Sequence, residues 1–134
     1  METFSTDTQR AKWLTASTNL DIIGCYAQTE IGHGSNVAGL ETIASFDKST
    51  DEFIIHTPTN TATKWWPGEM GRYANHALVF ARLQITDDGD MNDYGVCPFV
   101  VQIRDMDTHK WMKGVQCGDM GPKLGYIGKD NGWL

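Results

Sequence analysis

A chain of 134 residues is long enough for one globular domain and should bury roughly two-thirds of the surface that its unfolded form exposes. Its 40% hydrophobic residues and five tryptophans exclude a disordered chain. The net charge of -6, with lysines and arginines scattered along the sequence, argues against nucleic acid as a partner.

The cysteines and the apolar segments exclude further classes. Cys25, Cys97 and Cys117 are odd in number and far apart, which predicts reduced, mostly buried thiols and neither a disulfide framework nor a zinc site. No apolar stretch approaches the roughly 20 residues that a membrane-spanning helix needs, so we expect no membrane span. The first 14 residues lack the apolar centre of a signal peptide.

The chain begins with its one good helix candidate. Thr6 and Gln9 have the spacing of a capping box, which predicts a short helix near Asp7 to Ser17. A strand is expected over Ile22 to Gln28, followed by a loop in which several glycines permit conformations that bulkier residues resist.

The remaining sequence predicts strands separated by polar turns. Thr42 to Phe46 and Phe53 to Thr57 should form a hairpin, and Pro98 should place its strand at an edge or a bulge. The other expected elements are strands over Thr61 to Trp66, His76 to Ile85 and Val96 to Arg104, an acidic loop over Thr86 to Asp93, and short strands in the glycine-rich tail from Trp111 to Leu134.

These elements predict the fold class. Residues 1–134 should form a single, mostly β domain with one short N-terminal helix. Its antiparallel strands should build a closed or orthogonally packed β-barrel, because glycine-rich short strands suit the corners of such a sheet system.

The segment from Cys25 to Asn36 joins a strand to the glycine-rich loop. It brings backbone N–H groups and small hydroxyls to one exposed edge, which can donate hydrogen bonds to a planar, electron-accepting ring. An ordinary connecting turn explains the same residues, because most loops of this kind only link elements.

Lys64-Trp65-Trp66-Pro67-Gly68 holds two adjacent tryptophans. On a strand they would point to opposite faces, so one indole should enter the core and the other should cover something else. A flat cofactor fits, since Gly68 permits close approach of the backbone; another domain or subunit fits equally well.

The acidic and histidine side chains give no independent catalytic signal. Glu30 is expected to accept hydrogen bonds from backbone amides and not to act as a general base. The four histidines show no metal-ligand spacing, and the acidic loop lacks the ligand pattern of a calcium site, so we expect no metal.

Four segments in order carry a family resemblance. They are Tyr26 to Glu30 with Gly34-Ser35, Lys64 to Gly68, Gly118 to Lys123, and Asp130-Asn131-Gly132. This ordered set resembles the middle β-domain of peroxisomal acyl-CoA oxidases, within the acyl-CoA dehydrogenase superfamily, over nearly the whole chain. Asn36, where the wider superfamily usually has Asp after Gly-Ser, favours the oxidase branch.

The resemblance implies that this chain is one part of a longer flavoenzyme with helical domains on both sides and FAD held where the β-domain meets them. By matching positions, Thr29 and Gly68 look like flavin contacts, with Tyr26, Gln28 and Trp66 close by. Gly34 and Ser35 resemble positions that touch the acyl-CoA substrate.

In that family a glutamate of the C-terminal helical region removes the α-proton, the β-hydride passes to the flavin, and O2 reoxidises it. The products are trans-2-enoyl-CoA and H2O2, in fatty-acid β-oxidation. The matching glutamate is not in this chain, so no catalytic residue is expected here and the isolated chain should be inactive. The resemblance also implies a homodimeric parent protein and a peroxisomal location, although the final residues carry no peroxisomal tripeptide.

Two other interpretations stay open at this point. The parent enzyme could be an acyl-CoA dehydrogenase that passes electrons to another protein instead of to O2. The chain could also be a free-standing, non-catalytic β-barrel used for binding.

Overall fold

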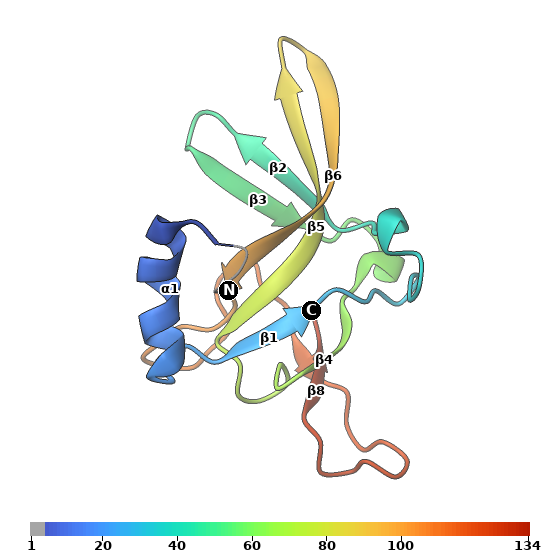
Figure 1. Cartoon of the computed structure of the whole chain (residues 1–134). Helices are drawn as coiled ribbons and strands as arrows, with labels where there is room; N and C mark the ends of the chain where they lie inside the picture. Colours follow the sequence, from blue (N-terminus) through green and yellow to red (C-terminus); the bar gives the residue numbers. More distant parts are fainter. Residues whose placement is uncertain (1–4) are drawn as a thin grey trace.

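The computed structural model describes residues 5–134. Helix α1 spans Asp7–Thr18 and begins with the predicted capping box: Thr6 Oγ1 accepts from Gln9 N, and Gln9 Oε1 accepts from Thr6 N at 2.9 Å. The helix lies beside the sheet and has no fully buried residue (Figure 1). Its Trp13 ring packs edge-on against His76. The predicted N-terminal helix is therefore confirmed.

A five-stranded sheet forms the larger part of the molecule. Strand β5 is its centre: its first residues pair with β1, its later residues pair with β2, and β6 runs antiparallel along its other side (Figure 1). Strand β3 pairs with β2. The five strands are β1 (Gly24–Ala27), β2 (Ile43–Asp47), β3 (Glu52–His56), β5 (His76–Asp87) and β6 (Asp90–Gln102).

A second, smaller sheet lies below it in Figure 1. Strand β8 (Asn131–Trp133) pairs antiparallel with β4 (Trp65–Gly68) on one side and with β7 (Gly118–Asp119) on the other. Two short 3-10 helices, η1 (Val37–Gly39) and η2 (Asn60–Ala62), lie in the connections. The two sheets meet where Trp65 N donates to Thr29 O at 2.8 Å.

The mostly β fold with one helix is confirmed, but the barrel prediction is wrong. Within residues 5–134 neither sheet closes, because closure requires two neighbours for every strand, whereas β1, β3 and β6 of the larger sheet and β4 and β7 of the smaller one each pair with only one. The larger sheet is also mixed and not purely antiparallel, since β5 runs parallel to both β1 and β2. Alternating sequence patterns reveal strands but not the directions in which distant strands pair.

One predicted hairpin and the predicted edge position of Pro98 agree with the structure, whereas the acidic loop differs. The predicted hairpin is confirmed as β2–β3, and Pro98 lies on β6, which pairs only with β5 among the described residues. The acidic loop expected over Thr86 to Asp93 is instead the tip of the β5–β6 hairpin. Asp88 and Gly89 have φ of 49° and 93° there, as a two-residue turn between twisted strands requires.

The buried core lies where the first half of β5 faces the chain around Met70 and Ile103. Most of its members are small, and it contains two of the three cysteines. Burial raises the pKa of Cys25 and of Cys117 to about 12, so both thiols stay uncharged at neutral pH. The cluster consists of Cys25, Ala27, Met70, Ala74, Ala77, Val79, Ile103 and Cys117.

Candidate functional site

An open cavity of about 350 Å³ lies where the two sheets meet. It is lined by residues from β1 and the segment directly after it, from β4, and from the start of β8. Its lining is Tyr26, Thr29, Trp65, Trp66, Pro67, Gly68 and Asn131. Residues from three segments that are far apart in the sequence therefore form one site.

Four of the five predicted flavin contacts line this cavity: Tyr26, Thr29, Trp66 and Gly68. The fifth, Gln28, lies beside them, because its Oε1 accepts a hydrogen bond of 2.8 Å from the Tyr26 hydroxyl. The structure thus brings the predicted cofactor residues together, while their contact with a flavin stays a prediction.

The arrangement of the two tryptophans differs from the prediction. Neither indole enters the core: Trp65 is 38% exposed and Trp66 is 59% exposed. Trp66 has a left-handed φ of 64°, and the pairing of β4 with β8 shifts register between Trp65 and Gly68, so the strict alternation of a strand is lost. Asn131 Nδ2 donates to Trp66 O at 2.7 Å and supports this conformation.

Thr29 has hydrogen-bonding groups to offer. Its carbonyl oxygen is occupied by Trp65 N, but neither its N–H nor its hydroxyl bonds to another residue within 5–134. Beside it stand the exposed aromatic faces of Tyr26 and Trp66. Flat apolar faces next to unused donors suit a planar heteroaromatic ring with acceptor atoms on its rim, so the residues present fit the isoalloxazine of FAD.

The glycine-rich loop lies outside this cavity. Gly34 and Ser35 are both exposed, and neither is among the residues that line it. A Cβ atom built on Gly34 would meet no described atom within 4 Å, so packing within residues 5–134 does not require glycine there. The structure therefore does not bring the two predicted acyl-CoA residues into the cavity with the predicted flavin contacts.

Glu30 and Lys64 form a buried ion pair next to the cavity, with Nζ to Oε1 at 2.9 Å. The structural role predicted for Glu30 is confirmed, because its carboxylate accepts hydrogen bonds from Glu41 N at 2.7 Å and Thr42 N at 2.9 Å. The lysine partner was not predicted. The available signal was that Lys64 lies two positions after Ala62 on a predicted strand, so that alternation places its side chain on the same face as the alanine, where burial demands a counter-charge.

The surroundings shift the pKa of both members of the pair. Burial alone would raise the pKa of Glu30, but hydrogen bonds from Glu41, Thr42 and Lys64 outweigh it, and the pKa lies below its usual value. Burial lowers the pKa of Lys64, and Glu30 offsets part of that effect. With the carboxylate ionised, the pair keeps opposite charges in contact away from water.

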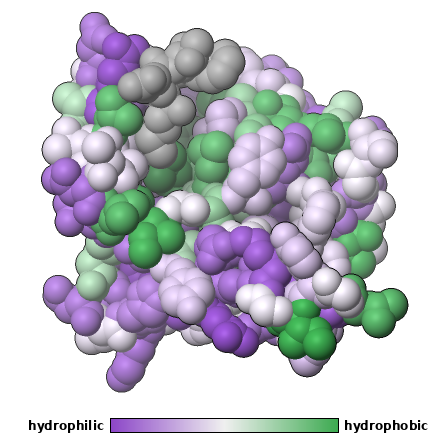
Figure 2. All heavy atoms as spheres, turned by 60° about the horizontal axis from the view of Figure 1, so that its bottom comes forward, coloured by the Kyte–Doolittle hydropathy of each residue, from purple (hydrophilic) through white to green (hydrophobic). Residues whose placement is uncertain are grey.

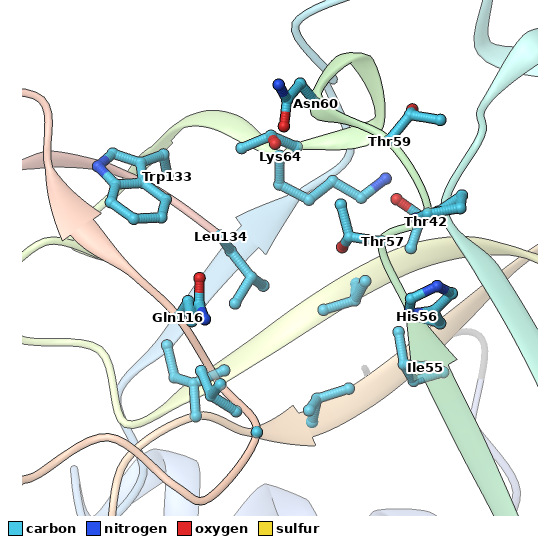
Figure 3. A pocket seen from close by; sticks show the side chains of 17 residues that line it. Thr42, Ile55, His56, Thr57, Thr59, Asn60, Lys64, Gln116, Trp133 and Leu134 are labelled. Carbon is cyan, nitrogen blue, oxygen red and sulfur yellow. The ribbon is translucent and has the colours of Figure 1, made fainter.

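A larger cavity of about 470 Å³ contains none of the predicted site residues. Figure 3 shows it between the β2–β3 side of the larger sheet and the last residues of the chain, with Trp133 and Leu134 on one side and His56 and Thr57 on the other. Lys64 lines this cavity, but its buried ammonium already donates hydrogen bonds to three oxygens. The side chains of Thr57, Asn60 and Gln116 also line it without a hydrogen bond to another residue within 5–134, so the cavity is polar, but none of the predicted flavin or acyl-CoA contacts lies in it.

The surface near the smaller sheet is mixed. Figure 2 turns this end of the molecule towards the reader and shows hydrophobic side chains in separate groups among hydrophilic ones. Exposed large hydrophobic residues in the segment before β8 include Leu124, Tyr126 and Ile127. Within residues 5–134, no helix has the length and hydrophobicity of a membrane span.

Comparison with known proteins identifies the family of this chain. The model of the family "Acyl-CoA dehydrogenase, middle domain" matches residues 25–134. Peroxisomal acyl-coenzyme A oxidase 1 of Arabidopsis thaliana is 53% identical over 132 residues, which are 96% of this chain and 19% of that protein. Acyl-coenzyme A oxidase acox-1.2 of Caenorhabditis elegans is 50% identical over 134 residues, which are 100% of this chain and 20% of that protein.

A solved structure gives the same result. Acyl-CoA oxidase-2 of Caenorhabditis elegans, crystallised with FAD, ascaroside-CoA and ATP, superposes with a TM-score of 0.90 at 52% identity, covering 97% of this chain and 19% of that one. The chain thus spans about a fifth of the length of these relatives. Because the family model covers residues 25–134, the chain belongs to the family of the acyl-CoA dehydrogenase middle domain, and its resemblance to peroxisomal acyl-CoA oxidases is confirmed.

Proposed function

We propose that residues 1–134 form one domain of a longer, peroxisomal, FAD-dependent acyl-CoA oxidase. That enzyme would convert acyl-CoA to trans-2-enoyl-CoA and reduce O2 to H2O2, with flanking helical domains supplying the catalytic base and a homodimer as its assembly. The observation that carries the proposal is the shared cavity of Thr29, Trp66 and Gly68 in a chain about 50% identical to acyl-CoA oxidases.

In this proposal Tyr26, Gln28, Thr29, Trp66 and Gly68 bind FAD. When bound, FAD supplies the acceptor for the hydride that leaves the β-carbon of the acyl chain. The indole of Trp66 would cover one face of the ring, and the unused N–H and hydroxyl of Thr29 would donate to its rim. Donors aimed where negative charge grows stabilise the reduced state.

Gly34 and Ser35 would contact the acyl-CoA. Both are exposed on a loop whose ends are held close to the proposed flavin site, so a substrate lying on this loop would reach the cavity edge. Holding the reacting carbons in place in this way reduces the entropic part of the barrier.

The test uses the full-length protein that contains this chain. The purified protein should show flavin absorbance and release one H2O2 for each acyl-CoA desaturated. Thr29→Val should weaken FAD binding about tenfold, the value of one lost hydrogen bond of about 1.4 kcal/mol. Thr86→Val, on the exposed tip of the β5–β6 hairpin, is the matched control and should bind FAD like the wild type.

Two results would overturn the proposal. Full-length protein without flavin after reconstitution with FAD would remove the cofactor role. Flavin-bound protein that desaturates acyl-CoA only with a protein electron acceptor, and yields no peroxide, would identify a dehydrogenase instead.

A further inference from the structure

The buried pair of Glu30 and Lys64 connects the two proposed ligand sites. All of its contacts are internal: the two side chains are 0% and 1% exposed, and neither residue lines the 350 Å³ cavity. Any influence on a ligand must therefore pass through the segments that the pair holds.

Lys64 fixes the flavin side. Its Nζ donates to Gln28 O at 3.1 Å, to Glu30 Oε1 at 2.9 Å and to Phe80 O at 2.6 Å, so all three ammonium protons are used. The bond to Gln28 ties down the residue immediately before Thr29. Trp65, the residue after Lys64, also donates its N–H to Thr29 O. Lys64 and its neighbour therefore hold the carbonyl groups of two consecutive residues, Gln28 and Thr29.

Glu30 fixes the glycine-rich loop. One end of this loop follows directly from Glu30, and the other end returns to its carboxylate, where Oε2 accepts from Glu41 N and Oε1 accepts from Thr42 N. The Thr42 hydroxyl also donates to Oε1. One carboxylate therefore closes the loop that carries Ser35 at both ends.

The contacts of Lys64 and those of the loop meet at Glu30 Oε1, which accepts from both Lys64 and Thr42. Figure 3 shows the Lys64 side chain extending from the segment before β4 towards Thr42, and both side chains donate to Glu30 Oε1. Burying two charges costs desolvation energy, and an apolar pair of equal volume is often as stable. This pair also satisfies the N–H groups of Glu41 and Thr42 and the carbonyls of Gln28 and Phe80, and these directional bonds define where both segments lie.

We propose that Glu30 and Lys64 are positioning residues, which set the flavin-contacting segment around Thr29 and the acyl-CoA loop around Ser35 in one fixed relation. The proposal rests on the proposed function, because it assigns ligands to those two segments. Neither residue touches a ligand, so neither is catalytic.

The main test is the double variant Glu30→Leu with Lys64→Met in the full-length protein. It removes both charges together and keeps similar volume, but it leaves the N–H groups of Glu41 and Thr42 and the carbonyls of Gln28 and Phe80 without their partners, so the melting temperature should fall and binding is measured well below it. A positioning role predicts that the Kd for FAD, measured by quenching of flavin fluorescence on titration of apoprotein, and the KM for acyl-CoA each rise at least tenfold. Wild-type Kd and KM in the folded double variant would overturn the inference.

A second variant separates the two arms and does not depend on the double variant folding. Thr42→Val removes one donor to Glu30 and leaves the contacts of Lys64 in place. It should raise the KM for acyl-CoA several-fold and speed amide hydrogen exchange over residues 31–41, with the Kd for FAD unchanged. An unchanged KM and unchanged exchange would contradict the inference even if the double variant does not fold.

Lys48→Met is the matched control, since it removes a lysine from an exposed ion pair and should alter none of these values. The wild-type protein distinguishes a failure of the proposed function from a failure of the positioning role. If the wild-type protein neither binds FAD nor oxidises acyl-CoA, the proposed function is wrong. If the wild type is active and the variants keep its Kd and KM, only the positioning role is wrong.

Discussion

Two lysine–carboxylate contacts of similar length lie in opposite surroundings. Lys64 and Glu30 are 2.9 Å apart with both side chains buried, whereas Lys48 and Asp87 are 2.6 Å apart with side chains 59% and 64% exposed. The exposed contact competes with water and dissolved salt. The buried contact is shielded from bulk solvent, so loss of one partner leaves a buried charge without a counter-charge. Distance alone therefore says little about what an ion pair does in this molecule.

The largest expected effect comes from breaking the buried pair on one side. Lys64→Met should lower the free energy of unfolding by about 3–5 kcal/mol, because it leaves the Glu30 carboxylate buried without its counter-charge. Urea unfolding followed by tryptophan fluorescence measures it. A loss below about 1 kcal/mol would mean that water reaches the pair and that the contrast with the surface pair is unfounded.

A smaller effect is expected from Glu30→Gln, which keeps an acceptor oxygen for Lys64 but loses the charge. It should cost about 3 kcal/mol at neutral pH, the low end for a buried pair broken on one side, because the Lys64 ammonium stays buried without a counter-charge and the new NH2 group faces a backbone donor. Because the folded-state pKa of Glu30 lies below its ordinary value of 4.5, the carboxylate's stabilisation is fully present above that value and disappears as pH falls through the lowered pKa. Unfolding curves of the two proteins should thus converge in acid; a constant difference from neutral pH to acid would contradict this account.

Glu41 tests whether hydrogen bonds near the surface can shift a pKa without burial. Hydrogen bonds from Thr59, Thr61 and His33 lower the pKa of Glu41 to about 2. Its contribution to stability is present above the ordinary 4.5 and is lost as pH falls through about 2. Carboxyl chemical shifts in NMR should show this titration, and Thr59→Val should move it towards 4.5. Titration of the wild type at its ordinary value would show that these bonds do not persist in solution.

The smallest effect belongs to the exposed pair. A double-mutant cycle with Lys48→Met and Asp87→Asn should give a coupling near the error of the measurement, and added salt should reduce it further. A coupling as large as the effect of Lys64→Met would remove the distinction between the two regions.

Local features of the fold were predictable from the sequence. The capping box of Thr6 and Gln9 specifies the start of α1, and the alternating segments on either side of residues 47–51 specify the β2–β3 hairpin. The hydrogen bonds involved join residues that are close in the chain. The β5–β6 tip could also have been predicted, because Asp88-Gly89 is a two-residue hairpin signal.

The candidate site was predictable in its residue types but not in its shape. The ordered segments around Thr29 and Gly68 pointed to a common cavity, and both residues line it. Strand alternation wrongly placed one tryptophan in the core, because the left-handed backbone of Trp66 depends on a register shift against β8 and on the amide of Asn131, 65 residues away. Such contacts leave no periodic trace in the sequence.

The sequence by itself determined the N-terminal helix, the β2–β3 hairpin and the family, and it supplied the residues proposed for the ligand sites, because caps, turns and motifs act over a few positions. Only the tertiary structure decided that the sheets stay open, that β5 runs parallel to two neighbours, and that Glu30 meets Lys64 across 34 residues. Pairing between distant segments is selected by burial of the whole surface and by the need of each buried charge for a partner.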